Sequence, residues 1–160
     1  MADLRQQLTE LGLSQVETYI NSGNIFFTTA LSRSQLVERL STFFETYYPF
    51  IERFSLLSRE DYEAECANLP DWWTEEMARK DVLFYTEGLD RESVEEKLLA
   101  LDLGEEVLHF GKLAVFWGKF SEESYAKTAY HKHLMKIPFY RQMTIRNANT
   151  FDKIGRLLKK

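Results

Sequence analysis

The chain has 160 residues, of which 44% are hydrophobic and 14% aromatic, which is enough apolar material for one medium domain or two small ones and argues against disorder. No apolar run approaches the length of a membrane span and the N-terminus lacks a signal-peptide pattern, so we expect a cytoplasmic protein without a membrane partner. Cys66 is the single cysteine, which excludes an internal disulfide.

The net charge of −5 is unevenly distributed along the sequence. Residues 124–160 hold nine Lys/Arg against one acid, Asp152, whereas residues 1–123 hold eleven Lys/Arg and twenty-four Asp/Glu, so the two parts carry +8 and −13. Such asymmetry is a hint of a phosphate-bearing or acidic partner. A dipolar surface kept for solubility explains it equally well.

The first half of the chain alternates helical and strand-like patterns. In order, they predict a helix from about residue 1 to Gly12, strands at about 16–20 and 25–28 joined by a tight turn, a helix at 32–47, a strand at 51–57, and a helix capped by Ser58. Residues 68–80, with Pro70 and the pair Trp72-Trp73, interrupt this regularity and are expected to be a linker.

The second half gives a similar series of elements. It predicts strands at 81–85, 106–110, 113–117 and 140–145, helices at 91–101 and 122–135, and a last helix from about residue 150. The order β-α-β-β-α-β plus a helix is the split βαβ arrangement called ferredoxin-like.

The two halves read as copies of one another. A shift of 89 residues places Pro49-Phe50 on Pro138-Phe139 and Ser58 on Asn147, the two expected helix caps. We therefore expect an α+β protein with two tandem ferredoxin-like halves, residues 1–67 and 81–160, separated by the linker 68–80. The counterpart of strand 81–85 would precede Met1, so the first half is expected to lack its first strand and the chain to start late.

Two stretches, Tyr19 to Phe27 (YINSGNIFF) and Thr144 to Thr150 (TIRNANT), resemble the signature stretches of a bacterial family known as domain of unknown function 1697. The resemblance covers essentially the whole chain and implies two ferredoxin-like halves in a cytoplasmic protein, with no catalytic residue to carry over. Family members usually begin with a strand and a glycine-rich segment that are lacking here. They also often have tryptophan where this chain has Ala148.

The second stretch lies where a strand is expected to end and a helix to begin. Free amides at a helix N-terminus attract anions, and Arg146 adds a bidentate donor beside them. The equivalent cap at Ser58 is followed by two acids, so only the second cap looks open to phosphate. The expected anion-binding residues are Arg146, Asn147, Asn149, Thr150 and, on the basic helix before them, Lys127. Ordinary capping by Asn147 or Asn149 is the alternative.

The first stretch contains the turn Asn21, Ser22, Gly23 and Asn24, which can present amides to a ligand or can simply meet the demands of a tight hairpin. No metal site is expected, because His131 and His133 point apart on a helix. His109, alone on a strand, is expected to be a hydrogen-bonded core or surface histidine and not a catalytic base. No glycine-rich phosphate loop or catalytic motif is present in the sequence, so we predict neither a cofactor nor a catalytic residue. Cys66 is expected to be a buried, inert thiol.

These patterns lead to three hypotheses. The first is a non-enzymatic module that binds a nucleotide or nucleic acid through its basic C-terminal surface. The second is an enzyme for a small phosphorylated or nucleotide substrate, with the turn at 21–24 and Arg146 in one cleft. The third is a structural protein that forms a homodimer through Trp72-Trp73 and open sheet edges.

Overall fold

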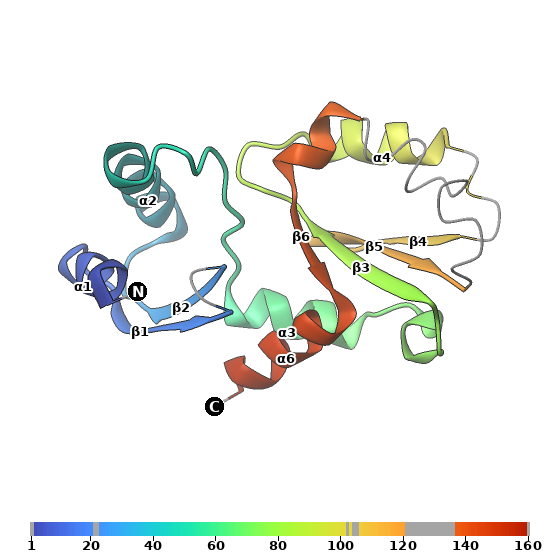
Figure 1. Cartoon of the computed structure of the whole chain (residues 1–160), viewed down its shortest axis with the longest axis horizontal. Coiled ribbons are helices and arrows are strands. Elements are labelled where there is room, and N and C mark those ends of the chain that lie inside the picture. Colours follow the sequence, from blue (N-terminus) through green and yellow to red (C-terminus); the bar gives the residue numbers. More distant parts are fainter. Residues whose placement is uncertain (1, 21–22, 102, 104–105, 121–136, 160) are drawn as a thin grey trace. The chain divides into compact units, whose positions relative to one another are not determined.

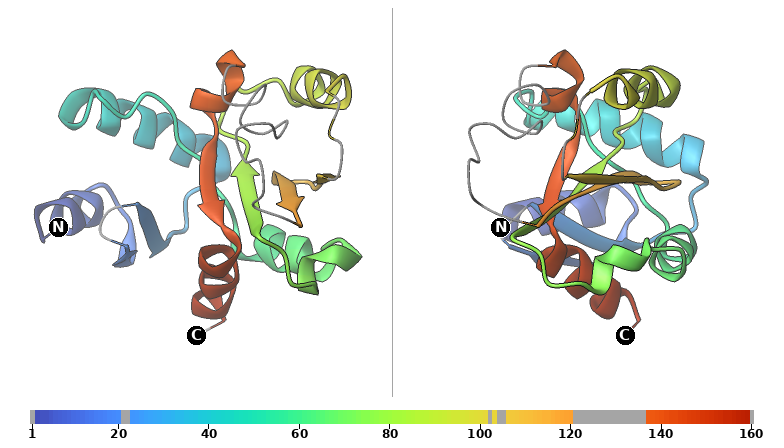
Figure 2. Two further views of the ribbon diagram at one scale, coloured as in Figure 1. Left: turned by 45° about the vertical axis from the view of Figure 1, so that its right-hand side comes forward. Right: turned by 90° about the vertical axis from the view of Figure 1, so that its right-hand side faces the viewer.

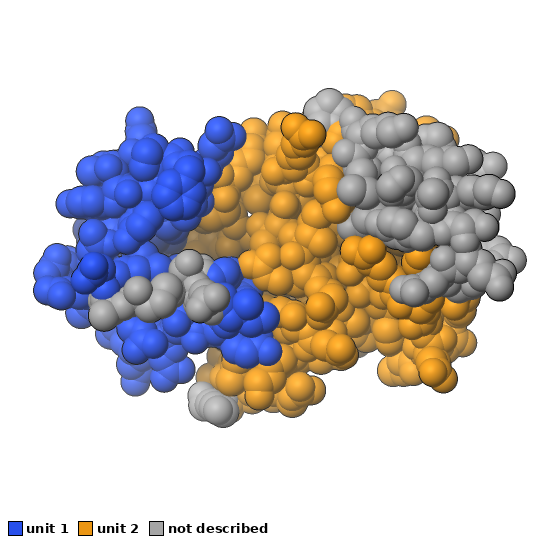
Figure 3. Space-filling model, in the orientation of Figure 1, with its two compact units in different colours: residues 1–52 blue, residues 53–160 orange. Residues whose placement is uncertain are grey.

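The computed structural model describes residues 2–20, 23–101, 103, 106–120 and 137–159. Its contacts divide the chain into two compact units, Met1–Glu52 and Arg53–Lys160, which Figure 3 colours separately. The described residues contain five α-helices and two antiparallel sheets, which confirms the expected α+β class. None of the described helices is long and apolar enough to cross a membrane.

Unit 1 contains a hairpin and two helices: α1 (Ala2–Glu10), β1 (Ser14–Tyr19), β2 (Asn24–Thr28) and α2 (Arg33–Tyr47) (Figure 1). Gly12 ends α1 in a left-handed conformation with φ of 109°, and the amide of Leu13 donates back to the carbonyl of Leu8. A capping box between Ser32 and Gln35 starts α2. The predicted order of these elements is confirmed. Their buried side chains are Leu4 and Leu8 of α1, Leu36, Leu40 and Phe43 of α2, and Leu13, which follows the end of α1.

Unit 2 is built on a four-stranded antiparallel sheet with strand order β4-β5-β3-β6. The strands are β3 (Arg79–Phe84), β4 (Val107–Phe110), β5 (Ala114–Lys119) and β6 (Thr144–Asn147). Figures 1 and 2 show α4 (Arg91–Leu99) on one face of the sheet, and α3 (Arg59–Ala67) and α6 (Ala148–Leu158) on the other. Two 3-10 helices complete the unit, η1 (Asp71–Thr74) and η4 (Pro138–Gln142).

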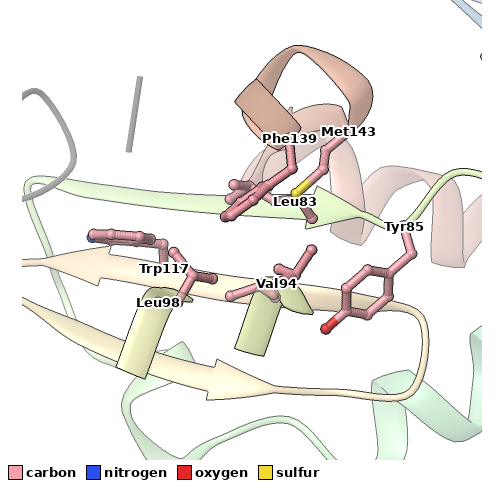
Figure 4. Close-up of a cluster of buried hydrophobic side chains, with 8 residues drawn as sticks. Leu83, Tyr85, Val94, Leu98, Trp117, Phe139 and Met143 are labelled. Atoms are coloured by element: carbon pink, nitrogen blue, oxygen red, sulfur yellow. The ribbon is translucent and has the colours of Figure 1, made fainter. Parts of the chain in front are cut away.

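Each face of this sheet has its own core. On the α4 face, buried side chains from β3, β5 and α4 meet those of Phe139 and Met143 from the η4 side (Figure 4). On the other face, aromatic rings dominate, because Tyr62 stacks on Phe151 at 4.9 Å between ring centroids and Trp73 meets Phe116 edge-on at 5.3 Å. The Tyr62 hydroxyl donates to the carbonyl of Phe151 at 2.7 Å, which joins α3 to α6.

Two predicted strands are corrected by the structure. Residues 51–57 form no strand, because isolated hydrogen bonds hold them in place of a strand-to-strand ladder. Ser55 Oγ donates to the carbonyl of Tyr85, and the backbone amide of Glu87 donates to the carbonyl of Phe54. The strand predicted at 140–145 begins only at Thr144, since η4 occupies the preceding residues. The helix predicted at 122–135 lies outside the described residues.

The units differ from the expected division at 68–80. Tyr62 and Trp73 are both buried in unit 2, so the contacts place α3 and η1 with the second sheet. The expected first half, residues 1–67, is thereby split after Glu52.

Candidate functional site

The β6–α6 junction, residues 146–150, is the site that the sequence predicted for an anion. Asn147 is the N-cap of α6, and its side-chain oxygen accepts the amide of Thr150 at 2.8 Å, so the capping alternative is confirmed for Asn147. Thr150 is buried and Asn149 is exposed. The cap satisfies one of the amides of the first turn, which leaves those of Ala148 and Asn149 for a ligand.

Arg146 lies one residue before this cap and is half-buried. Its Nη1 donates to the carbonyl of Ile145 at 2.8 Å. Burial lowers the pKa of the guanidinium from its ordinary value, yet an arginine starts so high that the group stays charged. The junction therefore places a fixed positive charge next to a helix N-terminus.

Strand pairing brings further charges to this end of the sheet. Asp81 of β3 is opposite Asn147, and Arg79 is opposite Lys119 of β5. The Arg79 Nε lies 2.6 Å from the Asp81 carboxylate. Asp81 is only 4% exposed. Burial raises the pKa of Asp81, and the charges of Arg79 and Lys119 oppose that rise. Two cations thus surround Asp81, and a second buried acid, Glu106, accepts from the indole of Trp117, the residue opposite Asp81.

These charges lie on both faces of the sheet. Arg146 is opposite Val82, whereas Asp81 is opposite Trp117, a residue of the α4-face core, so alternation separates Arg146 from the Arg79 group. The sequence did not single out Arg79, Asp81 or Lys119. The sequence shows only that Arg79 precedes one predicted strand and Lys119 follows another. These two strand ends come together only when the strands pair.

The other predicted site residues lie either outside the described residues or in unit 1. Lys127, Asn21 and Ser22 lie outside the described residues. Gly23 and Asn24 belong to unit 1, where the Gly23 amide donates to the carbonyl of Ile20 and Asn24 Nδ2 donates to that of Tyr19 at 3.0 Å. Both contacts suit a tight turn. A cleft shared by this turn and Arg146 stays a prediction.

A second polar cluster, at the β4–β5 turn, was not predicted. Glu65 of α3 is 4% exposed, and its carboxylate accepts the amides of Lys112 at 3.2 Å and Leu113 at 2.6 Å. Burial raises the pKa of Glu65, against the effect of these two hydrogen bonds. Lys112 also pairs with Asp61 of α3 at 3.0 Å. All of these contacts fasten the turn to α3, so we assign the cluster a structural role.

Other singled-out side chains are also structural. Trp73 is 4% exposed and packs on Phe151, so it is not available as a surface for a partner. Cys66 is half-buried and burial raises the pKa of its thiol, which disfavours the reactive thiolate as expected. Among the described residues, no group of three or more His, Cys, Asp or Glu side chains is placed to hold a metal.

A hollow in unit 1 lies along α2. It is an open groove of about 570 Å³ with Phe43 and Tyr47 in its lining and Arg39 beside them. Arg39 Nη1 donates to the carbonyl of Leu11 at 3.3 Å and so holds the end of α1. The rest of the lining consists of Leu11, Gln35, Glu38, Thr42 and Thr46, and it includes none of the predicted ligand-binding residues that the structure describes.

Similarity to known proteins identifies the family. A family model described as "Protein of unknown function (DUF1697)" matches residues 1–116, which include the stretch Tyr19 to Phe27. The chain belongs to the DUF1697 family. The stretch Thr144 to Thr150, which also suggested this family, lies beyond the matched region.

A solved structure is similar to the whole chain. The conserved bacterial protein SP0830 from Streptococcus pneumoniae is 68% identical, with a TM-score of 0.97 over 100% of this chain and 89% of that one. No curated protein matches the sequence. The predicted family is thus confirmed, and the DUF1697 description carries no activity, ligand or partner with it.

Proposed function

We propose that this DUF1697 protein is a non-enzymatic module that binds a phosphate-bearing ligand, a nucleotide or nucleic acid, at the β6–α6 junction. The observation that carries the proposal is the half-buried guanidinium of Arg146, one residue before the N-cap of an eleven-residue helix. Amides at a helix N-terminus and an adjacent arginine are the usual elements of phosphate recognition. Ala148 and Asn149 would supply the amides.

The surrounding charge supports the same ligand. Arg79 and Lys119 stand at this end of the sheet, on the face opposite to that of Arg146, and Asp81 offsets one of them. Along α6, Lys153, Arg156 and Lys159 continue the excess of basic residues that marks positions 124–160. A positive field of this kind attracts phosphates before any contact forms.

We further propose that the units derive from two tandem ferredoxin-like halves and that the protein is cytoplasmic. The strand order β4-β5-β3-β6, with antiparallel neighbours throughout, supports a ferredoxin-like second half. In unit 1 the order α1-β1-β2-α2 repeats the helix-hairpin pattern of α4-β4-β5. The proposed function does not depend on this ancestry.

Binding of short single-stranded RNA, single-stranded DNA and free nucleotides, measured across a salt series, tests the function. We expect affinity to fall with salt, and Arg146→Gln to weaken binding and to reduce the salt slope by about one phosphate contact. Arg141→Gln is the matched control, because it removes the same charge from an exposed position in η4. Absence of binding to all three probes at low ionic strength, or equal losses in both variants, would contradict the proposal.

A further inference from the structure

We draw no further inference here: the strongest candidate, the groove of unit 1 that runs along α2 and has Phe43 and Tyr47 in its lining, is a surface hollow for which nothing in the structure shows what covers it.

Discussion

Replacing Gly111 by alanine is expected to destabilise unit 2 strongly, because Glu65 occupies the space that the new methyl group needs. A Cβ atom at position 111 would lie 1.7 Å from Glu65 Oε1 and 2.9 Å from Phe116 Cε2. The first distance is far inside van der Waals contact. The carboxylate would therefore have to leave its position at the turn.

The size of the effect follows from what Glu65 gives up. Its carboxylate accepts the amides of Lys112 and Leu113 at 3.2 and 2.6 Å, and the site is buried. A hydrogen bond to a charged group contributes about 1.5–3 kcal/mol, so losing both costs about 3–6 kcal/mol. A domain of ordinary stability has about 5–15 kcal/mol in total, so Gly111→Ala is expected to leave much of the protein unfolded or close to it.

Urea unfolding of a double-mutant cycle measures this effect. In a Glu65→Ala background, the clash of the added methyl group with the carboxylate is gone and that with Phe116 remains, so Gly111→Ala should cost less there by roughly 2 kcal/mol or more. Equal costs in the two backgrounds, within ~0.5 kcal/mol, would refute the idea that the glycine exists to admit Glu65.

Three further changes test other parts of unit 2. Gly155→Ala in α6 should raise the free energy of unfolding by up to ~1 kcal/mol, because alanine favours a helix more than glycine does. The new Cβ would stand at ordinary contact distances, 3.5 Å from Cys66 and 3.6 Å from Tyr62. A lower free energy of unfolding in urea would show that α3 and α6 pack too tightly for the added methyl group. Tyr85→Phe should stabilise the protein by about 1 kcal/mol in the same assay, because the Tyr85 hydroxyl is buried without a hydrogen-bond partner among the described residues. The same burial raises the pKa of Tyr85 to about 12. A clear destabilisation would reveal a hydrogen-bond partner. Glu65→Gln should flatten the pH dependence of stability, because burial raises the pKa of Glu65 above its unfolded value of about 4.3 and the folded state then binds the proton more tightly. The wild type should therefore gain stability relative to the variant as the pH falls from neutral to about 4. Urea midpoints that change in parallel for the two proteins would contradict the raised pKa.

Part of the candidate site could be predicted from local sequence. Asn147 was expected as a cap because an asparagine stood between a strand pattern and a helix pattern, and it does accept the amide of Thr150. Arg146 was expected beside it on the same ground. Capping involves residues within one turn of each other, so sequence distance and spatial distance agree.

The charges around that cap could not be predicted. Arg79 and Lys119 face each other only through the register of β3 and β5, and Asp81 reaches Asn147 only through that of β3 and β6. The same limit applies to Glu65, whose partners are the amides of a turn far along the chain. The sequence pattern showed Glu65 as one more acid on a charged helix.

The expected linker illustrates the same distinction. Pro70 and the two tryptophans interrupt the helical pattern, which is a local property, and η1 does interrupt it. Whether such a segment separates domains or belongs to one of them depends on what its side chains touch. Trp73 touches Phe116 and Phe151, and these contacts assign the segment to unit 2.

By itself, the sequence determined the order of most helices and strands, their caps, and the family to which the chain belongs, since these depend on residues a few positions apart. The tertiary structure decided where the units divide, which acids are buried, and which charges strand pairing brings to the end of the sheet near the β6–α6 junction. Those properties depend on strand register and on desolvation, which arise only when distant segments pack together. The hairpin of the Tyr19 to Phe27 stretch belongs to the first group, because its two strands are neighbours in the sequence.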